Sequence, residues 1–294
     1  MQNKLAIIIL NWKQYELTIK CLSSVYKSKF KDFEIVLVDN ESNTEKLKNL
    51  LKNFKKIKVF QNDENLGFGA ANNIAINYAI QNNFEYLMLL NNDTEVDENF
   101  ILPLLNIINN DNLIGAVQPL IMNYNNKNSI WSAGGYVNKF FGYTSTNKNS
   151  NGNLKLDWIT GCCMLLKTDL IKKVGLIDEN FFAYYEDVDW SLRIKDLGYS
   201  LKLVNTSLVY HYGSKSSENS SSEGSLSPKV HYLNFKNHLY LLRKHNKKFN
   251  LLGLILYQFI KLFFYSTYFI LRFRFNKLKI IYKGIIDGLK LEIK

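Results

Sequence analysis

The sequence predicts an α/β protein with a mainly parallel central sheet, followed by a helical extension at the C-terminus. In residues 1–120, short apolar runs alternate with segments of helical periodicity, which is the order expected of a doubly wound sheet. The runs are almost continuously apolar, as in strands that helices cover on both faces. A hydrophobic content of 47% in 294 residues is enough for one large domain and an appendage.

The alternation assigns the first elements in chain order. The expected strands are Leu5–Leu10, Phe33–Val38, Ile57–Phe60, Tyr86–Leu90 and Ile114–Val117. The expected helices between them are Tyr15–Tyr26, Thr44–Phe54, Ala70–Ile80 and Glu98–Ile108. In a parallel sheet, ligands bind beyond the carboxyl ends of the strands. Polar residues follow the first four strands at those ends, namely Asn11, Asp39-Asn40, Asn62-Asp63 with Asn65, and Asn91-Asn92-Asp93.

The second half of the sequence predicts less regular elements. Residues 123–153 are rich in Asn, Gly, Ser and Tyr, which favours loops and short strands. Further strands are expected at Trp158–Lys167, Ser200–Val204 and Leu208–Tyr210, and helices at Thr168–Val174 and from Pro228 to about Lys244. The Ser- and Gly-rich segment Gly213–Ser227 is typical of a flexible loop or hinge. We therefore expect one domain in residues 1–227 and an extension in residues 228–294.

The net charge of +11 is concentrated in that extension. Residues 229–294 hold 14 Lys and Arg against two Asp and Glu, whereas residues 1–228 are nearly neutral. A basic extension indicates contact with an anionic surface, and a nearly neutral body with few arginines argues against nucleic acid as a partner. Three cysteines form no disulfide framework, and the first apolar run is too short for an export signal. These observations predict a cytoplasmic protein that associates peripherally with the inner face of the cell membrane.

The segment Leu251–Leu271 has the length and composition of a membrane span. Polar side chains nevertheless recur at spacings of three and four and form one stripe on an otherwise apolar helix. The members of the stripe are Gln258, Lys261, Tyr265, Tyr268 and Arg272. A lysine near the middle favours a helix that lies in the bilayer interface over residues 251–272. Packing on the rest of the chain or on a second subunit is the alternative, which leaves homo-oligomer formation open.

The stretch from Phe181 to Arg193 is the most informative part of the sequence for chemistry. It places three carboxylates, Glu186, Asp187 and Asp189, in an aromatic and apolar setting. Carboxylates in such a setting are solvated at a helix start, paired, or held near a metal or a substrate. The run fits the first turn of a helix, where the macrodipole favours acids. Helix capping therefore competes with catalysis as an explanation of this motif alone.

Three other features have both a chemical and a structural explanation. Asp93 follows a buried strand and can share Mg²⁺ or Mn²⁺ with a diphosphate, or cap the next turn. The segment Asn65–Gly69 offers small residues and backbone N–H groups to a phosphate, although Gly-x-Gly is also common in turns. His211 closes a strand, where a histidine is a ligand or a structural residue.

Six short motifs occur in order along residues 4–245. They are Ile-Ile-Ile-Leu-Asn-Trp at 7–12, Val-Asp-Asn at 38–40, Asn-Leu-Gly-Phe-Gly at 65–69, Leu-Leu-Asn-Asn-Asp-Thr at 89–94, Thr-Gly-Cys-Cys-Met-Leu at 160–165 and Tyr-Glu-Asp-Val-Asp-Trp-Ser-Leu-Arg at 185–193. Each motif is weak alone, but their combination resembles family-two glycosyltransferases. The similarity is greatest to the rhamnosyltransferase and galactofuranosyltransferase branches.

The resemblance implies a nucleotide-diphospho-sugar transferase fold of the GT-A type and a metal-dependent, inverting transfer. Asp187 matches the catalytic base, and Asp93 with His211 matches a site for Mn²⁺ or Mg²⁺ in which Asn91 replaces the first acid of the family motif. The residues that match the donor-nucleotide site are Asn11, Asp39, Asn65, Gly67, Gly69 and Asn92. Those on the acceptor side are Glu186, Asp189, Gly161, Cys162 and Trp158.

The resemblance predicts transfer of a sugar, rhamnose-like or another hexose, from a nucleoside-diphosphate donor to a hydroxyl of a cell-envelope glycan or lipid-linked acceptor. A solvated Asp is a weak base, so Asp187 requires an apolar wall, for which Phe182, Tyr184, Tyr185 and Trp190 are candidates. One alternative is a non-catalytic scaffold of the same fold at the membrane. A sugar nucleotidyltransferase is less favoured because no Gly-rich loop with a basic residue follows the first strand.

Overall fold

A computed structural model describes residues 4–54, 56–151, 154–213, 218–221 and 224–293. The described chain forms two compact units. The sheet unit comprises Met1–Tyr136, Thr146–Phe182 and Glu186–Gly213, and the helical unit comprises Val137–Ser145, Ala183–Tyr185 and Ser214–Lys294. The predicted division into a domain of residues 1–227 and an extension of residues 228–294 stays a prediction.

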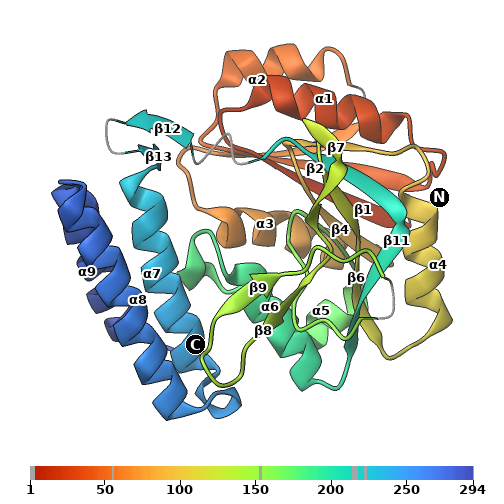
Figure 1. Ribbon diagram of the computed structural model, residues 1–294. Helices are drawn as coiled ribbons and strands as arrows, with labels where there is room; N and C mark the ends of the chain where they lie inside the picture. Colours follow the sequence, from red (N-terminus) through yellow and green to blue (C-terminus); the bar gives the residue numbers. More distant parts are fainter. Residues whose placement is uncertain (1–3, 55, 152–153, 214–217, 222–223, 294) are drawn as a thin grey trace. The chain divides into compact units, whose positions relative to one another are not determined.

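A mixed sheet forms the centre of the sheet unit (Figure 1). Its strands are β1 (Leu5–Asn11), β2 (Phe33–Asn40), β3 (Ile57–Asn62), β4 (Tyr86–Asn91), β5 (Thr94–Val96), β6 (Ile114–Asn123), β7 (Asn126–Ser132), β10 (Cys163–Lys167) and β11 (Ser200–His211). Across the described residues their order is β3-β2-β1-β4-β10-β6-β11-β5, with β7 paired to β6. The first four strands run parallel, as predicted, and their register places Asn11 beside Asp39 and Asn40 beside Asn62.

The sheet is mainly parallel, as predicted, and strand β10 runs antiparallel between β4 and β6 within it. Two other details differ from the sequence prediction. Strand β10 begins at Cys163, and the residues before it, from Trp158, form only an isolated bridge to Gly135. The two strands expected at Ser200–Val204 and Leu208–Tyr210 are one strand, β11, with a register shift between Val204 and Leu208 that interrupts the apolar pattern.

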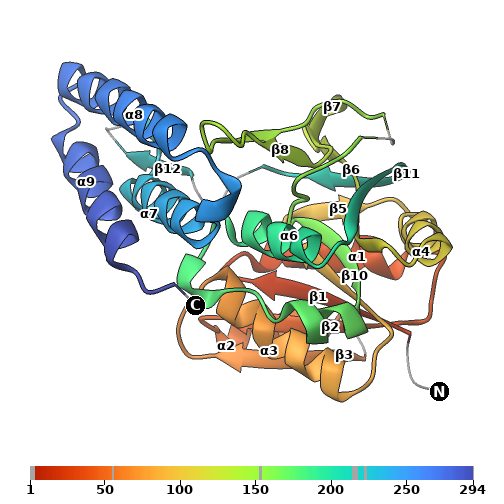
Figure 2. The ribbon, with the colours of Figure 1, turned by 90° about the horizontal axis from the view of Figure 1, so that it is seen from below.

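Helices cover both faces of the sheet, which explains its continuously apolar strands (Figure 2). Helices α1 (Tyr15–Tyr26), α2 (Thr44–Leu51) and α4 (Ile101–Asn110) contribute to the core on one face. Helices α3 (Phe68–Gln81), α5 (Thr168–Val174) and α6 (Glu186–Asp196) contribute to the core on the other. Helix α6 begins inside the acidic run, as predicted from the macrodipole.

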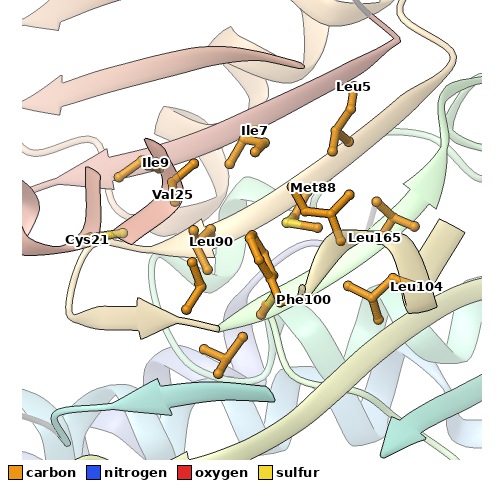
Figure 3. Close-up of a cluster of buried hydrophobic side chains, with 14 of the residues drawn as sticks. Leu5, Ile7, Ile9, Cys21, Val25, Met88, Leu90, Phe100, Leu104 and Leu165 are labelled. Carbon is orange, nitrogen blue, oxygen red and sulfur yellow. The ribbon is translucent and has the colours of Figure 1, made fainter. Parts of the chain in front are cut away.

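The core on the first face is filled by alternate residues of the central strands. Figure 3 shows Leu5, Ile7 and Ile9 of β1 with Met88 and Leu90 of β4 pointing into one cluster. All five side chains are buried, and the cluster also takes in Cys21 and Val25 of α1 and Leu104 of α4. Cys21, Cys162 and Cys163 are free and buried, in agreement with the prediction that the three cysteines form no disulfide framework. This packing holds the carboxyl ends of β1 and β4 in place.

The loop region predicted for residues 123–153 contains two short strands besides β7. They are β8 (Gly135–Val137) and β9 (Thr144–Thr146). The Ser- and Gly-rich segment predicted as flexible falls partly on residues 214–217 and 222–223, which lie outside the described residues. Its described parts form the paired strands β12 (Glu218–Ser221) and β13 (Gly224–Leu226).

The helical unit contains α7 (Pro228–Lys244), α8 (Leu251–Leu271) and α9 (Phe275–Lys290). Pro228 stands at the start of α7 as predicted, and the Ser227 hydroxyl accepts a hydrogen bond from Val230 N (3.4 Å). Helix α9 packs closely on α7 because it presents two glycines, Gly284 and Gly288. A Cβ at either position would lie within 2.7 Å of a backbone carbonyl oxygen of α7, so a larger side chain would force the helices apart.

Helix α8 directs its polar stripe toward other parts of the helical unit. Lys261 Nζ lies 3.2 Å from His238 Nδ1 and 4.4 Å from the ring centroid of Phe235. The ring of Tyr265 packs edge-on against Phe235. The opposite side of α8 is apolar and exposed, with Phe259 at 70% and Leu271 at 72%. Among the described residues, α8 is the one helix long and apolar enough to cross a membrane, and only 11% of its most apolar window is buried.

Gly67, which precedes α3, has a backbone conformation that demands glycine. Its φ is +85°, and a Cβ there would lie 2.5 Å from the carbonyl oxygen of Phe182. We expect Gly67→Ala to lower the free energy of unfolding more than Gly198→Ala, in urea unfolding followed by circular dichroism. Gly198 has the same φ but open space around the added methyl group, so its substitution reports backbone strain alone, about 1–2 kcal/mol. Equal losses in the two variants would show that the loop moves freely away from Phe182.

Candidate active site

Asp93 and His211 meet at the carboxyl end of the sheet. His211 is the last residue of β11, and its register partner on β5 is Thr94, the residue after Asp93. Tyr212 N donates to Asp93 O (2.9 Å), which fixes the two segments together. As a result His211 Nε2 lies 3.2 Å from Asp93 Oδ1, and both side chains are buried. The sequence placed these residues 118 positions apart in the same predicted site, and the structure brings them together.

The pair Asp93 and His211 fits a divalent cation that is shared with a substrate. A carboxylate oxygen and an imidazole nitrogen are both metal ligands, and Mg²⁺ or Mn²⁺ in such sites takes further oxygens from phosphates and water. Among the described residues, no group of three or more His, Cys, Asp or Glu side chains is arranged to hold a metal. A cation here would therefore depend on the diphosphate for the rest of its ligands.

A buried hydrogen-bond network links the ends of β1, β2 and β4. Asn11 Nδ2 donates to Asp39 Oδ1 (2.5 Å), and Asn92 Nδ2 donates to Asn11 Oδ1 (3.2 Å). The second oxygen of Asp39 accepts from the hydroxyls of Tyr15 (2.9 Å) and Ser42 (2.7 Å). Asp39 is fully buried. The structure thus gathers three of the residues predicted for the donor nucleotide, Asn11, Asp39 and Asn92, into one rigid unit.

The loop that contains Asn65, Gly67 and Gly69 is tied to the end of β2. Asn65 Oδ1 accepts from Asn40 Nδ2 (2.9 Å) and from Gly67 N (2.9 Å), and Asn40 Oδ1 accepts from Leu66 N (3.0 Å). Packing also explains why positions 67 and 69 are glycine, since a Cβ at either position would press on residues 177–182. The glycines are therefore required by packing, whether or not a phosphate binds beside them.

Asp187 stands in the first turn of α6 and accepts hydrogen bonds from the segment before β10 and from α6 itself. Gly161 N donates to Asp187 Oδ2 (3.1 Å), and Val188 N donates to Asp187 Oδ1 (2.8 Å). Burial raises the pKa of Asp187, and hydrogen bonds from Gly161, Val188 and the Thr160 side chain partly oppose the rise. The apolar wall includes Phe68, because Gly161 is so placed that its Cβ would touch both the Phe68 ring (3.3 Å) and Asp187 Cβ (3.7 Å).

Glu186, beside Asp187, is a buried carboxyl group. Burial, reinforced by the charge of Asp187, raises the pKa of Glu186 to about 8. Its Oε2 atom has no hydrogen-bond partner among the described atoms, and the same holds for the indole Nε1 of the buried Trp158. Two of the residues predicted for the acceptor side thus each carry an unsatisfied buried polar atom, which is costly in a protein without a ligand.

The segment Thr160–Cys162 connects Asp187 to the end of β4, which Asp93 follows. Gly161 N holds Asp187, and the next carbonyl, Cys162 O, accepts from Asn91 N (2.8 Å) at the end of β4. The Cys162 thiol has its pKa raised by burial and then by the charges of neighbouring groups, among them Asp93 and Asp187. Both carboxylates therefore lie within electrostatic range of one side chain. The antiparallel placement of β10 beside β4 produces this arrangement.

Asp189 differs from the other acids of the run. Its side chain is fully buried, and its Oδ2 accepts from Arg193 Nε (2.8 Å), one helical turn later. The guanidinium of Arg193 also donates to the carbonyl oxygens of Val174 and Leu176, so the pair fastens α6 to the end of α5. A contact between Asp189 and an acceptor stays a prediction.

Residues 6–175 match the model of the family described as glycosyl transferase family 2, and this match covers more than half of the chain. The chain belongs to glycosyl transferase family 2. The matched residues include the ends of β1, β2 and β4 and the segment Thr160–Cys162, and the acids of α6 follow the match.

Two relatives of this family 2 chain have descriptions that name sugar transfer. One is the low-salt glycan biosynthesis hexosyltransferase Agl10 of Haloferax volcanii, 28% identical over 199 residues, which make up 66% of this chain and 62% of the relative. The other is the dTDP-rhamnosyl transferase RfbF of Shigella flexneri, 24% identical over 226 residues, or 72% of this chain and 71% of the relative. The first match thus leaves more than a third of that relative uncovered.

Solved structures of low sequence identity share the fold of the family 2 chain. GalNAc-T7 with UDP, GalNAc and Mn²⁺ gives a TM-score of 0.64 at 20% identity and covers 82% of this chain and 48% of that one. Mannosyltransferase PcManGT of Pyrobaculum calidifontis, in complex with GDP-Man and Mn²⁺, gives a TM-score of 0.60 at 11% identity and covers 100% of this chain and 77% of that one. These likenesses confirm the predicted GT-A-like fold.

Sequence analysis assigned no role in the site to four side chains that support it. They are Thr18, which accepts from Asn92 (2.9 Å), Asn40, which holds the Asn65 loop, Thr160 beside Asp187, and Trp131, whose ring lies 4.2 Å from that of His211. Helical spacing could have predicted the role of Thr18, because this residue lies in the first turn of α1, soon after Asn11. The contact between the tilted rings of Trp131 and His211 joins β7 to β11, and no local sequence pattern predicts it.

Glu186 gives the family 2 chain a pH dependence of stability with a defined sign. Its pKa rises from an ordinary 4.5 to about 8 in the folded protein, so the folded state keeps a proton that the unfolded state releases. The free energy of unfolding therefore falls as pH rises through this window, by on the order of 1 kcal/mol per pH unit. We expect Glu186→Gln to remove this loss and to gain stability relative to the wild type between about pH 5 and about pH 8.

Urea unfolding at several pH values measures the difference between Glu186→Gln and the wild type.

Proposed function

We propose that this chain is an inverting glycosyltransferase that uses a nucleoside-diphosphate sugar. The observation that carries the proposal is the connection, through Thr160–Cys162, of a buried aspartate to a paired Asp93 and His211. A raised pKa makes the Asp187 carboxylate a stronger base than a solvated aspartate. Family membership and the sugar-transferring relatives support the same chemistry.

The proton transfer at Asp187 follows from its environment. As the acceptor hydroxyl oxygen attacks the anomeric carbon, Asp187 takes the hydroxyl proton, and the bond to the diphosphate breaks on the opposite face of the sugar. The N–H groups of Gly161 and Val188 hold the carboxylate in one orientation during this step. The unsatisfied atoms of Glu186 and Trp158 would bind hydroxyl groups of the acceptor.

Asp93 and His211 would hold the divalent cation, Mn²⁺ or Mg²⁺. When bound, such a cation supplies charge stabilisation for the diphosphate leaving group. Asp39, Asn11 and Asn92 would form the floor of the nucleotide pocket, and the Asn65 loop its side. The structures of GalNAc-T7 and PcManGT, which share the fold, hold UDP or GDP-Man together with Mn²⁺, and this supports a metal-assisted donor site of the same class.

The descriptions of the relatives suggest the class of donor sugar and acceptor. The relatives are described as a hexosyltransferase of glycan biosynthesis and a dTDP-rhamnosyl transferase, so we propose a rhamnose-like or other hexose and a cell-envelope glycan or lipid-linked acceptor. The exposed apolar side of α8 and the basic charge of residues 229–294 support peripheral association with the inner face of the cell membrane.

A nucleotide panel tests the proposed function. UDP, dTDP, GDP and ADP are titrated calorimetrically into the full chain, each with and without Mn²⁺. We expect Mn²⁺ to strengthen the binding of one of them. Asp93→Asn should remove that enhancement, about a hundredfold in Kd, because a carboxylate that would hold the cation is lost.

The control for the nucleotide panel is Asp169→Asn, which makes the same charge change at an exposed carboxylate. It should bind as the wild type does. Failure of a folded wild-type sample to bind any of the four nucleotides would overturn the enzyme proposal and favour a scaffold of the same fold.

A further inference from the structure

The helical unit contains a groove between α7, α8 and α9 that the proposed catalytic function does not use. Its volume is about 620 Å³, within the range of small-molecule sites. Most of its walls are aliphatic or aromatic, including Phe235, Leu239, Leu254, Phe259, Leu262 and Ile285. A sugar or a nucleotide needs several convergent polar groups, so these walls select an apolar ligand.

Polar side chains also line this groove. Arg243 lies in the last turn of α7, and Asn246 follows the end of that helix. Arg243 Nη1 donates to the carbonyl oxygens of Gly288 (2.9 Å) and Leu291 (2.8 Å). Gln258 Nε2, within the apolar part, is buried without a hydrogen-bond partner among the described atoms. A guanidinium fixed in place next to apolar walls suits a molecule with a hydrocarbon chain and an anionic head.

The groove is continuous with the exposed apolar surface of α8. Leu251, Ile255 and Phe259 line it and are also 72%, 46% and 70% exposed. A contiguous apolar surface of this kind marks a membrane or protein contact. The charge of residues 229–294, with 14 basic and two acidic side chains, complements an anionic membrane surface.

We propose that the groove between α7, α8 and α9 holds one hydrocarbon chain of an anionic phospholipid, with the lipid phosphate near Arg243 and Asn246. The proposal deepens the membrane association proposed above and rests on it. The exposed side of α8 enters the bilayer interface, and one lipid leaves the leaflet to occupy the groove. The bound lipid would bury walls that otherwise stay in contact with water.

Native mass spectrometry of the full chain tests the proposal. The protein in a short-chain detergent is mixed with equal amounts of phosphatidylglycerol and phosphatidylcholine, and bound lipids are counted. We expect one phosphatidylglycerol per chain. Leu239→Trp, which fills the groove, should lower the retention of phosphatidylglycerol about tenfold, because the indole takes up volume that the lipid chain would occupy. Asn246→Asp should remove the preference for phosphatidylglycerol.

Two matched variants control this experiment. Leu256→Trp adds the same volume on the exposed side of α8, at a residue that does not line the groove, and should retain the lipid. Asn276→Asp adds the same charge at an exposed position of α9 away from the groove and should keep the lipid preference. Equal retention by Leu239→Trp and Leu256→Trp would overturn the proposal.

Two further results separate this inference from its alternatives. Complete displacement of phosphatidylglycerol by an equal amount of an isoprenoid phosphate would overturn the proposed occupant. A dimer whose groove retains no lipid would do the same. Nucleotide titration of the same samples is a separate readout, so loss of the donor site and loss of the lipid site are distinguishable.

Discussion

Asp187→Asn is expected to lower kcat by about 10²–10⁴-fold, the contribution of a general base. The amide has nearly the shape of the carboxylate but cannot take up the proton of the attacking hydroxyl group. The effect should fall mainly on kcat. Gly161 N and Val188 N donate to different oxygens of Asp187, so the single amide oxygen can keep one of these two hydrogen bonds. Nucleotide binding should be nearly unchanged, since the donor network around Asp39 makes no hydrogen bond to Asp187.

Measurement of sugar transfer or donor hydrolysis with Mn²⁺, beside calorimetric nucleotide binding, separates these effects. Asp169→Asn makes the same change at an exposed aspartate and should keep wild-type turnover. Wild-type turnover in Asp187→Asn would refute the base assignment. Loss of nucleotide binding together with turnover would instead indicate that Asp187 supports the fold of the site.

The local pattern of the sequence was sufficient to predict most helices and strands of the sheet unit. Apolar runs flanked by polar ends predicted β1 to β4, and the helix from Tyr15 to Tyr26 has the predicted bounds. The position of β10 was not predictable in this way, because a short apolar strand has the same pattern whether it pairs parallel or antiparallel. The register shift in β11 likewise depends on its partner, β6.

The candidate site shows the same division between local and long-range information. The acids of α6 and Asp93 were found because carboxylates in apolar sequence are rare, and the family resemblance supplied their roles. Motifs gave no information on the partners of these residues. Asp189 and Asp187 lie in one motif, yet Asp189 pairs with Arg193 inside the protein while Asp187 is held by Gly161, a residue 26 positions earlier.

The stripe of α8 shows how a correct pattern can have a different structural use. Periodicity located the polar residues Gln258, Lys261 and Tyr265 on one side of the helix, but not what that side would contact. In the structure Lys261 and Tyr265 contact α7, so this side is used for packing within the helical unit. The apolar side is consequently the one left exposed, which strengthens the case for a membrane contact.

The double substitution Phe263→Asp and Phe264→Asp is expected to reduce binding to anionic vesicles by about a hundredfold or more. The two rings are 66% and 65% exposed and lie on the apolar side of α8. Transfer of a phenylalanine side chain out of water contributes about 1.5–3 kcal/mol, and aspartate adds repulsion from anionic lipid. The substitutions are expected to leave the fold intact, because exposed residues contribute little to the core.

Vesicle sedimentation of the full chain, with phosphatidylglycerol at a fixed fraction of the lipid, measures this loss. Leu113→Asp is the matched control, since Leu113 is 65% exposed on the sheet unit and lies outside the basic extension. A membrane contact and a contact with a second subunit predict different outcomes for α8. If α8 packs on a second subunit, the double substitution should convert a dimer into a monomer and leave vesicle binding unchanged. Vesicle binding that the double substitution does not reduce would refute the interfacial role, because no other described helix has an apolar surface of spanning length.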